Sequence, residues 1–506
     1  MLFVSPLYKY YFNLLLNDFK NKMLYEINTR VWLKQFDSQK LIDVPRTYWE
    51  NLKNKGFEYI WLMGIWQTVP LATKKYCFVD GLINEYNNAL PNWKEEDVIG
   101  SPYAIDRYEV NPQIASKEEI IRLKKLFNNM GLKLILDFIP NHFNAETTLL
   151  KEHPEIFLKV NKELHDKDNK TFFMESYGTN YYAHGKDPYF EAWQDTIQIN
   201  YFTSEARDYM TNVLLELTNL CDGVRCDMAM LMLNSVFSNT WQEVKSVMNY
   251  DSPKNEFWSS AITQVKDKRK DFLFIAEAYW DLEYQLQTLG FDYTYDKRLY
   301  DRLTEGNVKS ISEHLKADKD YQLKSVRFIE NHDEKRSASV FGKRTKAAAV
   351  IMSTLLGMKL YYDGQFVGKK IKLPVQLGRE PKEEINIELQ NFYDKLLSIT
   401  KDKVFKKDEF ELLTPIQAWN DNDTHKNLLA WLRYYEERHR LVVVNYSDIT
   451  SVCRVKFNPL PDGLPSEEIA LDDLLNNKKY IRSVDEILTQ GLYIQLGPFE
   501  SHIFSF

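Results

Sequence analysis

The sequence GVRCDMA at residues 223–229 places an arginine and an aspartate two positions apart at the end of an apolar strand pattern. Side chains at positions i and i+2 of a strand point to the same face, so Arg225 and Asp227 should project together. A guanidinium group beside a carboxylate favours its charged form, so we expect Asp227 to be ionised at neutral pH. An ionised carboxylate can attack an electrophilic carbon, which makes Asp227 the candidate nucleophile.

Seven further runs of strand character surround this stretch and alternate with segments of helical periodicity. We predict strands at residues 24–32, 59–65, 133–139, 222–228, 272–279, 291–296, 326–333 and 359–365. Helices are predicted at 116–130, where Ser116 and a glutamate three positions later form a capping box, and at 204–220. The alternation predicts an α/β fold, a closed (β/α)8 TIM barrel, although an open doubly wound sheet has the same periodicity.

Three segments lie outside this alternation and set the expected domain boundaries. Residues 143–202 are polar, aromatic and glycine-containing, which predicts a small inserted subdomain after strand 3 of a catalytic barrel at 23–400. Residues 403–506 contain strand-like runs without long helices and predict a C-terminal all-β, sandwich-like domain. Residues 1–22 form an N-terminal extension that we expect to be dispensable, with Met1 or Met23 as the natural start.

Composition and charge exclude several classes of protein. A net charge of -7 with 44% hydrophobic and 27% charged residues is typical of a soluble globular protein and gives no basic patch for nucleic acid. The four cysteines, Cys77, Cys221, Cys226 and Cys453, have no metal-ligand spacing and are expected to be buried free thiols in a reducing compartment. The opening 22 residues make a poor signal peptide and are too short to span a membrane, so the sequence predicts a cytoplasmic protein.

Polar side chains gather where the predicted strands end. The active sites of such barrels lie at the C-terminal ends of the strands, so these side chains should meet on one rim. They are Asp137, Asn141 and His142 after the third strand, Arg225 and Asp227 after the fourth, Glu277 after the fifth, and Asn331, His332 and Asp333 after the seventh. Taken singly, each has a structural explanation: Asp137 as a partner of Arg225 inside the barrel, His142 as an ordinary loop residue, Glu277 as a surface charge.

Taken together, these motifs resemble the alpha-amylase family of retaining glycoside hydrolases and transglycosylases, glycoside hydrolase family 13. The matching stretches are DFIPNH at 137–142, GVRCDMAML at 223–231, AEAYW around Glu277, ENHD at 330–333, GSPYAIDRY at 100–108 and WQDTIQIN at 193–200. The resemblance implies an enzyme that cleaves alpha-glucosidic bonds in alpha-glucans or short maltooligosaccharides through a covalent glycosyl-enzyme. The alternative is a glycosyltransferring relative, of transglycosylase, sugar phosphorylase or maltosyltransferase type. A non-catalytic amylase-like binding subunit is a third possibility.

The resemblance also implies a role for each residue of the rim. Asp227 would be the nucleophile, Glu277 the general acid and base, and Asp333 the stabiliser of the transition state. Retaining hydrolysis has the same requirement on physical grounds, because it needs an ionised carboxylate about 5 to 5.5 Å from a protonated one. The side chains of Tyr103, His142, Arg225 and His332 would line the subsite that holds the attacked sugar.

The sequence departs from the starch-cleaving members of the family after the nucleophile. Those members commonly have Lys and His three and four positions further on, whereas this chain has Met230 and Leu231. Weak binding on the leaving-group side is therefore expected, unless the aromatic residues of the insert supply it. Asn141 matches a residue that often binds calcium, but the insert shows no clear partner set. We predict no metal site and no required cofactor, with a structural calcium left as a possibility.

Overall fold

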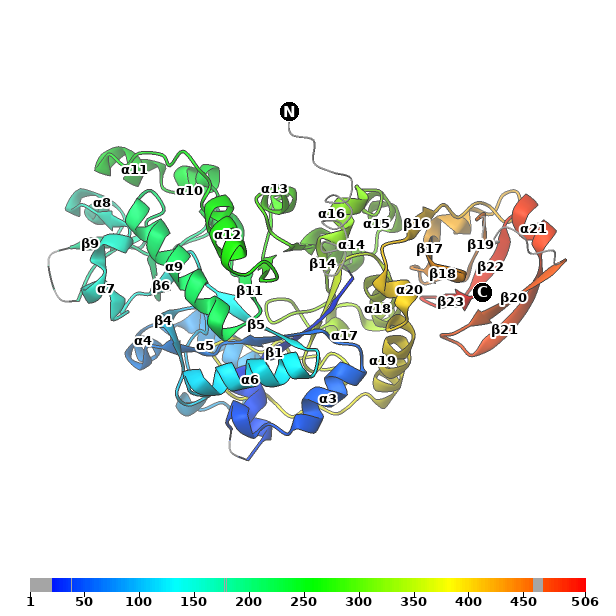
Figure 1. The fold of residues 1–506 in the computed structure, drawn as a ribbon, viewed down its shortest axis with the longest axis horizontal. Helices are drawn as coiled ribbons and strands as arrows, with labels where there is room; N and C mark the ends of the chain where they lie inside the picture. Colours follow the sequence, from blue (N-terminus) through cyan, green and yellow to red (C-terminus); the bar gives the residue numbers. More distant parts are fainter. Residues whose placement is uncertain (1–20, 38, 177, 179, 458–466) are drawn as a thin grey trace.

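The computed structural model describes residues 21–506 apart from 38, 177, 179 and 458–466. Eight parallel strands close a barrel in the order β1-β15-β14-β13-β12-β11-β5-β2 (Figure 1). They are β1 (Met23–Asn28), β2 (Tyr59–Met63), β5 (Lys133–Phe138), β11 (Gly223–Cys226), β12 (Leu273–Ala276), β13 (Tyr293–Tyr295), β14 (Ser325–Arg327) and β15 (Met358–Tyr362). The predicted barrel is confirmed, and the open sheet is excluded.

The strands are shorter than the sequence predicted, and always at their C-terminal ends. The prediction of 326–333 ends in the structure at Arg327, and that of 272–279 ends at Ala276. Beyond these points the backbone leaves the sheet and forms the rim loops, which carry Glu277 and Asp333. The apolar, β-branched pattern therefore continues past the hydrogen-bonded ladder into the loops that hold the polar side chains.

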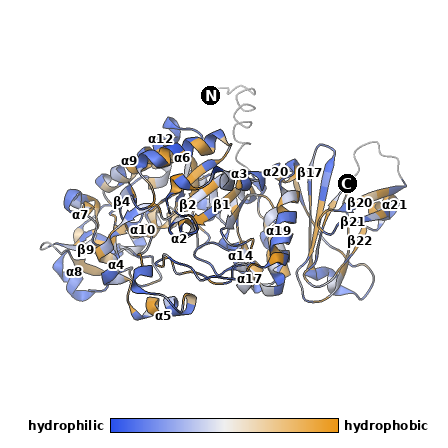
Figure 2. Cartoon of the chain, turned by 90° about the horizontal axis from the view of Figure 1, so that it is seen from below, coloured by the Kyte–Doolittle hydropathy of each residue, from blue (hydrophilic) through white to orange (hydrophobic). Residues whose placement is uncertain are grey.

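Helices surround the barrel, and most of them are amphipathic, whereas α18 (Thr345–Thr354) is buried on nearly every side. They include α3 (Arg46–Asn54), α6 (Lys117–Asn129), α9 (Ser204–Leu220), α12 (Phe257–Lys268), α14 (Lys297–Glu305), α18 and α19 (Ile387–Thr400). The predicted capping box starts α6, because the Ser116 hydroxyl accepts from the backbone N–H of Glu119 and the Glu119 carboxyl group accepts from that of Ser116. Figure 2 shows that α6 and α12 carry both hydrophilic and hydrophobic residues, as expected for helices with one face on a core.

The segment after β5 has small sheets of its own. It contains β6 (His142–Asn144), which pairs with β10 (Thr196–Gln198), and a three-stranded sheet of β7 (Lys159–Val160), β9 (Tyr181–Ala183) and β8 (Phe172–Met174), with α7 (Leu149–Glu152) and α8 (Lys162–Lys167) between them. The side chains of Phe143, Phe157, Phe172 and Tyr182 are buried. These aromatic residues give the insert a packed interior that joins the core of the barrel.

The C-terminal residues form two sheets, which confirms the all-β domain. One sheet has the order β16-β17-β18-β23-β20-β21, and the other pairs β19 with β22. Their bounds are β16 (Phe410–Leu413), β17 (Leu428–Tyr435), β18 (Arg438–Asn445), β19 (Ser451–Val455), β20 (Glu468–Asp473), β21 (Lys478–Ser483), β22 (Leu492–Leu496) and β23 (Ser501–Ser505). Alternate residues of β18 face opposite ways: Val442 and Val444 belong to the core of the barrel, whereas Leu441 and Val443 pack with the smaller sheet.

The barrel begins slightly before the predicted boundary at Met23. Residues 1–20 of the expected N-terminal extension lie outside the described residues, but Asn21 is 1% exposed and packed. Its amide accepts from the backbone N–H of Gly357 at 2.9 Å and donates to the carbonyl of Lys407 at 2.7 Å. The carbonyl of Lys22 accepts from the backbone N–H of Lys359 at 2.9 Å. Residues 21 and 22 therefore belong to the barrel and not to a dispensable extension.

We expect two N-terminal deletions to differ in stability. Removal of residues 2–22 leaves the buried N–H of Gly357 without its acceptor, which costs about 1 to 3 kcal/mol, whereas removal of residues 2–20 keeps this bond. Thermal denaturation followed by circular dichroism should therefore give a lower Tm for the longer deletion. Equal Tm values for the two deletions would show that Asn21 contributes nothing.

Two sequence predictions concern burial and membranes. All four cysteines are free and buried, as predicted. Across the part of the chain that the structure describes, no helix combines the length and the apolar character needed to cross a bilayer.

Candidate active site

The three predicted carboxyl groups meet around one guanidinium group on the rim of the barrel. Arg225 Nη1 lies 2.8 Å from Asp227 Oδ1, and Arg225 Nη2 lies 2.8 Å from Glu277 Oε2 and 4.0 Å from Asp333 Oδ2. Asp227 follows β11, Glu277 follows β12 and Asp333 lies in the loop after β14. The closed barrel thus brings together residues that are up to 108 positions apart, since the C-terminal ends of its parallel strands share one face.

Arg225 is held from below by a buried aspartate and aromatic rings. Its side chain is 1% exposed, and Asp137 Oδ1 lies 3.5 Å from Nη1. Asp137 in turn accepts from the indole N–H of Trp61 at 3.1 Å, and burial raises the pKa of Asp137 to about 6. The guanidinium carbon lies 5.1 Å from the ring of Trp61 and 5.3 Å from that of Tyr103. Asp137 therefore orients Arg225 from inside the barrel, which is the structural role that the sequence offered for it.

Asp227 differs from the expectation that Arg225 would keep it ionised. Burial raises the pKa of Asp227 to about 8, and the negative charges of Glu277 and Asp137 add to this rise. Arg225 lowers the pKa but does not offset these effects. Asp227, Glu277 and Asp137 therefore share the guanidinium of Arg225, and all three carboxyl groups are largely buried. A coupled group of this kind retains a proton near neutral pH, and its titration belongs to the set and not to one residue.

Glu277 is fixed by two hydrogen bonds that leave it beside Asp227. Its Oε2 accepts from the backbone N–H of Met228 at 2.7 Å, and its Oε1 accepts from the Tyr279 hydroxyl at 2.7 Å. Met228 has φ 43°, a left-handed conformation that is strained for a residue with a side chain. This backbone conformation points the Met228 N–H at Glu277. The role of Met228 could not be predicted from the sequence, because no residue type at that position signals a left-handed backbone.

Asp333 is the most accessible of the three carboxyl groups. Its side chain is 44% exposed, and its Oδ2 lies 2.9 Å from His332 Nε2. Desolvation would raise its pKa, but His332, Arg225 and Lys372 together hold the pKa of Asp333 well below its usual range. Asp333 is therefore a charged carboxylate that faces the open side of the rim.

His332 and Tyr103 form a stacked pair next to Asp333. Their rings lie 5.3 Å apart at 23°, and the Tyr103 hydroxyl lies 2.7 Å from His332 Nε2. The other ring nitrogen, Nδ1, hydrogen-bonds to Glu26 on β1. Sequence analysis did not select Glu26, although a carboxyl group within a strand whose residues are all buried was a signal that could have found it.

His142 is the first residue of β6. Its ring lies 5.3 Å from that of Trp193, and Nδ1 is 3.3 Å from the amide nitrogen of Asn141. Burial lowers the pKa of His142 to about 4, although a hydrogen bond to the backbone of Tyr103 raises it. His142 is therefore a neutral ring that connects the insert to the Tyr103 loop.

The surroundings of Asn141 do not fit a calcium ion. The amide Nε2 of Gln198 lies 2.8 Å from the carbonyl oxygen of Asn141, 3.0 Å from its Oδ1 and 3.1 Å from the carbonyl oxygen of Ile199. Calcium needs six to eight oxygen ligands, and an N–H donor among these oxygens takes the place of a cation. Among the described residues, no group of three or more His, Cys, Asp or Glu side chains could hold a metal.

An exposed aromatic edge lies beside the carboxyl groups. Tyr189 and Phe190 of the insert are 68% and 71% exposed, and the backbone N–H groups of both donate to Asp187. The ring of Tyr189 packs edge to face, at 4.9 Å, on Trp280, which is three residues after Glu277. Met230 and Leu231, by contrast, are buried in the core and offer no contact to a ligand.

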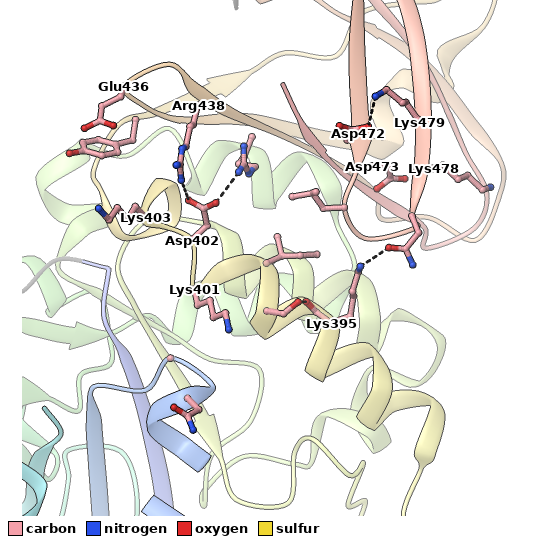
Figure 3. A pocket seen from close by; sticks show the side chains of 18 of the residues that line it. Lys395, Lys401, Asp402, Lys403, Glu436, Arg438, Asp472, Asp473, Lys478 and Lys479 are labelled. Carbon is pink, nitrogen blue, oxygen red and sulfur yellow. Dashed lines mark hydrogen bonds and ion pairs between the residues drawn. The ribbon is translucent and has the colours of Figure 1, made fainter. Parts of the chain in front are cut away.

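A cleft of about 1030 Å³ lies away from these residues (Figure 3). It is lined by residues before β2, by α19 and α20 (Lys403–Lys406), and by the C-terminal hairpins, with Asp402 paired to Arg440 at 2.9 Å. Residues before β2 lie at the N-terminal end of the barrel strands, whereas the carboxyl groups lie at the C-terminal end. None of the predicted site residues lines this cleft.

Comparisons with known proteins agree with this arrangement. Residues 50–433 match the family described as alpha amylase, catalytic domain. The chain is 24% identical over 357 residues to alpha-amylase MalA of Haloarcula japonica, which covers 69% of this chain and 48% of that protein. It is 23% identical to alpha-amylase 2 of Dictyoglomus thermophilum, covering 68% of this chain and 58% of that protein. The chain thus matches about half the length of these two curated relatives.

The likeness extends to solved structures. A noncanonic maltogenic alpha-amylase, AmyB of Thermotoga neapolitana, superposes with a TM-score of 0.67 at 21% identity and covers 96% of this chain and 98% of that one. At this identity the likeness shows the fold, including the C-terminal domain. The family match covers most of the chain and includes the strands that carry the three carboxyl groups. This chain therefore belongs to the alpha-amylase family.

Proposed function

We propose that this protein is a retaining glycoside hydrolase that cleaves alpha-glucosidic bonds in short maltooligosaccharides. The observation that carries the proposal is the convergence of Asp227, Glu277 and Asp333 on the single buried guanidinium of Arg225. Family membership supports the reaction class, while the roles of the individual residues rest on this geometry.

In the first step, Asp227 attacks the anomeric carbon while Glu277 gives its proton to the leaving oxygen. In the second step, Glu277 removes a proton from water, which displaces Asp227 from the sugar. Arg225 contacts both carboxyl groups, so it can stabilise each as its charge changes during the reaction. The ionised Asp333 would stabilise the positive charge that develops on the sugar. The stacked pair of Tyr103 and His332 would hold the ring of the attacked glucose.

The preference for short substrates follows from the residues on the side of the site that would bind the leaving-group sugar. Met230 and Leu231 are buried, so the ammonium and imidazole groups of starch-cleaving members have no equivalent there. Tyr189, Phe190 and Trp280 offer apolar faces instead, on which a pyranose ring can stack. Such a surface can hold a second sugar as an acceptor. The exposed aromatic edge therefore also favours the second candidate function, transfer of the glycosyl unit to another sugar.

Product analysis tests both functions. Proton NMR of the first sugar released from maltotriose should show the alpha anomer, and release of the beta anomer would exclude a retaining site. Chromatography of products from maltooligosaccharides, starch, trehalose, sucrose and glucose 1-phosphate would identify the linkage. Products longer than the substrate would establish transfer. Absence of products from the whole panel would instead favour a non-catalytic binding subunit.

The aromatic edge gives a prediction about substrate length. Tyr189→Ala and Trp280→Ala should each lower kcat/KM on maltotriose by about 10-fold, which corresponds to about 1.4 kcal/mol of lost stacking on a sugar ring. A substrate with a small leaving group, such as a glycosyl fluoride, should be nearly unaffected. Trp419→Ala is a matched control, since Trp419 is 52% exposed on the C-terminal domain. Equal losses on both substrates would place these rings outside the leaving-group subsite.

We also propose that activity does not depend on calcium. A chelator should leave both Tm and kcat/KM unchanged, because Gln198 donates to the oxygens that would otherwise bind the ion. The measurement is differential scanning calorimetry and turnover with EDTA and with added calcium. A fall in Tm of several degrees that calcium reverses would show that the ion displaces this amide.

A further inference from the structure

Glu26 is a buried carboxyl group that the proposed reaction does not use. It lies on β1 and is 0% exposed, and its Oε1 accepts from both the backbone N–H and the ring Nδ1 of His332. Its second oxygen, Oε2, has no hydrogen-bond partner in the described residues. A carboxyl group is costly to bury, so its placement under the rim needs a compensating interaction. The ring of His332 is that interaction.

The ring of His332 is fixed on every side. Glu26 holds Nδ1 from below, and Nε2 lies 2.9 Å from Asp333 Oδ2 and 2.7 Å from the Tyr103 hydroxyl on the open side. Tyr103 stacks on one face at 5.3 Å, and Trp61 meets the ring at right angles at 5.4 Å. Each nitrogen therefore faces a carboxyl oxygen. A ring that donates from both nitrogens is an imidazolium, because neutral imidazole has only one N–H.

We propose that Glu26 is a positioning residue that keeps His332 as an imidazolium with Nε2–H directed at Asp333 and at a hydroxyl of the bound sugar. The part that concerns the sugar rests on the proposed function, whereas the state of the ring does not. A fixed positive charge here would keep Asp333 ionised before substrate binds. It would also give the sugar a donor that needs no reorientation during the reaction.

The electrostatics agree with this geometry. Burial alone would lower the pKa of His332, but Asp333 and Glu26 raise it to about 10. The other charged or titratable groups around the pair are Asp137, which interacts with His332 and Glu26, Tyr295 and Tyr362, which interact with Glu26, and Arg225, Lys372, Tyr103 and Tyr279, which interact with Asp333. Because the folded pKa lies above the ordinary 6.5, this group stabilises the fold fully below about pH 6.5. That contribution is lost as pH rises through about 10.

The direct test is a titration of His332 by NMR in the full-length protein with 13C-labelled histidine rings. His332→Asn assigns the signal among the nine histidines. In the wild-type protein the ring should stay protonated well above pH 6.5. In Glu26→Gln, which keeps an acceptor but removes the charge, the midpoint should fall by about one pH unit or more. Asp222→Asn is a matched control, because Asp222 is 2% exposed and pairs with Arg269 before β11, at the other end of the barrel.

Kinetics separate positioning from a merely structural role. The loss of kcat/KM on maltotriose in Glu26→Gln should be larger at a pH above the lowered midpoint of the variant than at pH 6, where His332 is protonated in both proteins. A wild-type ring that titrates near pH 6.5 would overturn the proposal without any variant. So would a Glu26→Gln ring that titrates as in the wild type. If the wild-type protein lacked glycosidase activity, the proposed function would fail, while the ring titration would still decide the role of Glu26.

Discussion

Asp227→Asn should lower kcat on maltotriose by about 10⁴-fold or more, on the order seen when an enzyme loses its covalent nucleophile. The substitution keeps the size of the side chain, and Arg225 can still donate to the amide oxygen at the position of Asp227 Oδ1. The fold should therefore survive, and the Tm should change little near neutral pH. Burial raises the pKa of Asp227 to about 8, so the ionised carboxylate is unfavourable in the fold, and its replacement by an amide should raise the Tm relative to the wild type above about pH 8.

The matched control is Asp292→Asn. Asp292 is half-buried, pairs with Lys266 and accepts from the backbone N–H of Phe274, but it precedes β13 and lies at the far end of the barrel. Its loss should cost stability and not turnover. Turnover of Asp227→Asn within 10-fold of the wild-type value, measured after removal of any contaminating activity, would contradict the assignment of the nucleophile.

Periodicity was sufficient to locate the eight strands because every strand in the barrel is buried on both faces, but it left an open doubly wound sheet as an alternative to the closed barrel. Such strands are continuous apolar runs, which stand out from the amphipathic helices between them. The apolar runs continue into the loops, so the predicted C-terminal ends of the strands lay too far along the chain. Two of the strands end at Arg327 and Ala276 instead. The site residues could be proposed because parallel strands deliver their C-terminal ends to one face. The pairing of Arg225 with Asp227 could be predicted because residues two positions apart in a strand point to the same face.

The features that sequence analysis missed depend on contacts between distant residues or on backbone conformation. Glu26 meets His332 across 306 positions, and Tyr189 meets Trp280 across 91, so neither pair shares a local pattern. The left-handed backbone of Met228 is set by the rim around it. Asp227 was expected to be ionised from its neighbour Arg225 alone. The sequence suggested Asp137 as a partner of Arg225, but it could not show that Glu277 shares the same buried guanidinium.

Glu277→Gln should combine a dependence on the leaving group with the accumulation of a covalent intermediate. On maltotriose, turnover should fall by about 10² to 10⁴-fold, the usual contribution of a positioned acid. On a glycosyl fluoride, the first step should be nearly normal, because fluoride leaves without a proton. The second step should remain slow, since the same residue must deprotonate water. The variant should therefore accumulate a glycosyl-enzyme.

Mass spectrometry of peptides from that adduct gives the sharpest result in this set of experiments. The sugar should be attached to the peptide that contains Asp227, and sodium azide, which needs no base, should release it as the alpha-glycosyl azide. Tyr279→Phe is the matched control, because it removes only the hydrogen bond to Glu277 Oε1 and keeps the carboxyl group. That variant should turn over without accumulating the adduct. A sugar found on Asp333 instead would exchange the roles of these two carboxylates, and equal losses on fluoride and maltotriose would mean that Glu277 does not act on the leaving group.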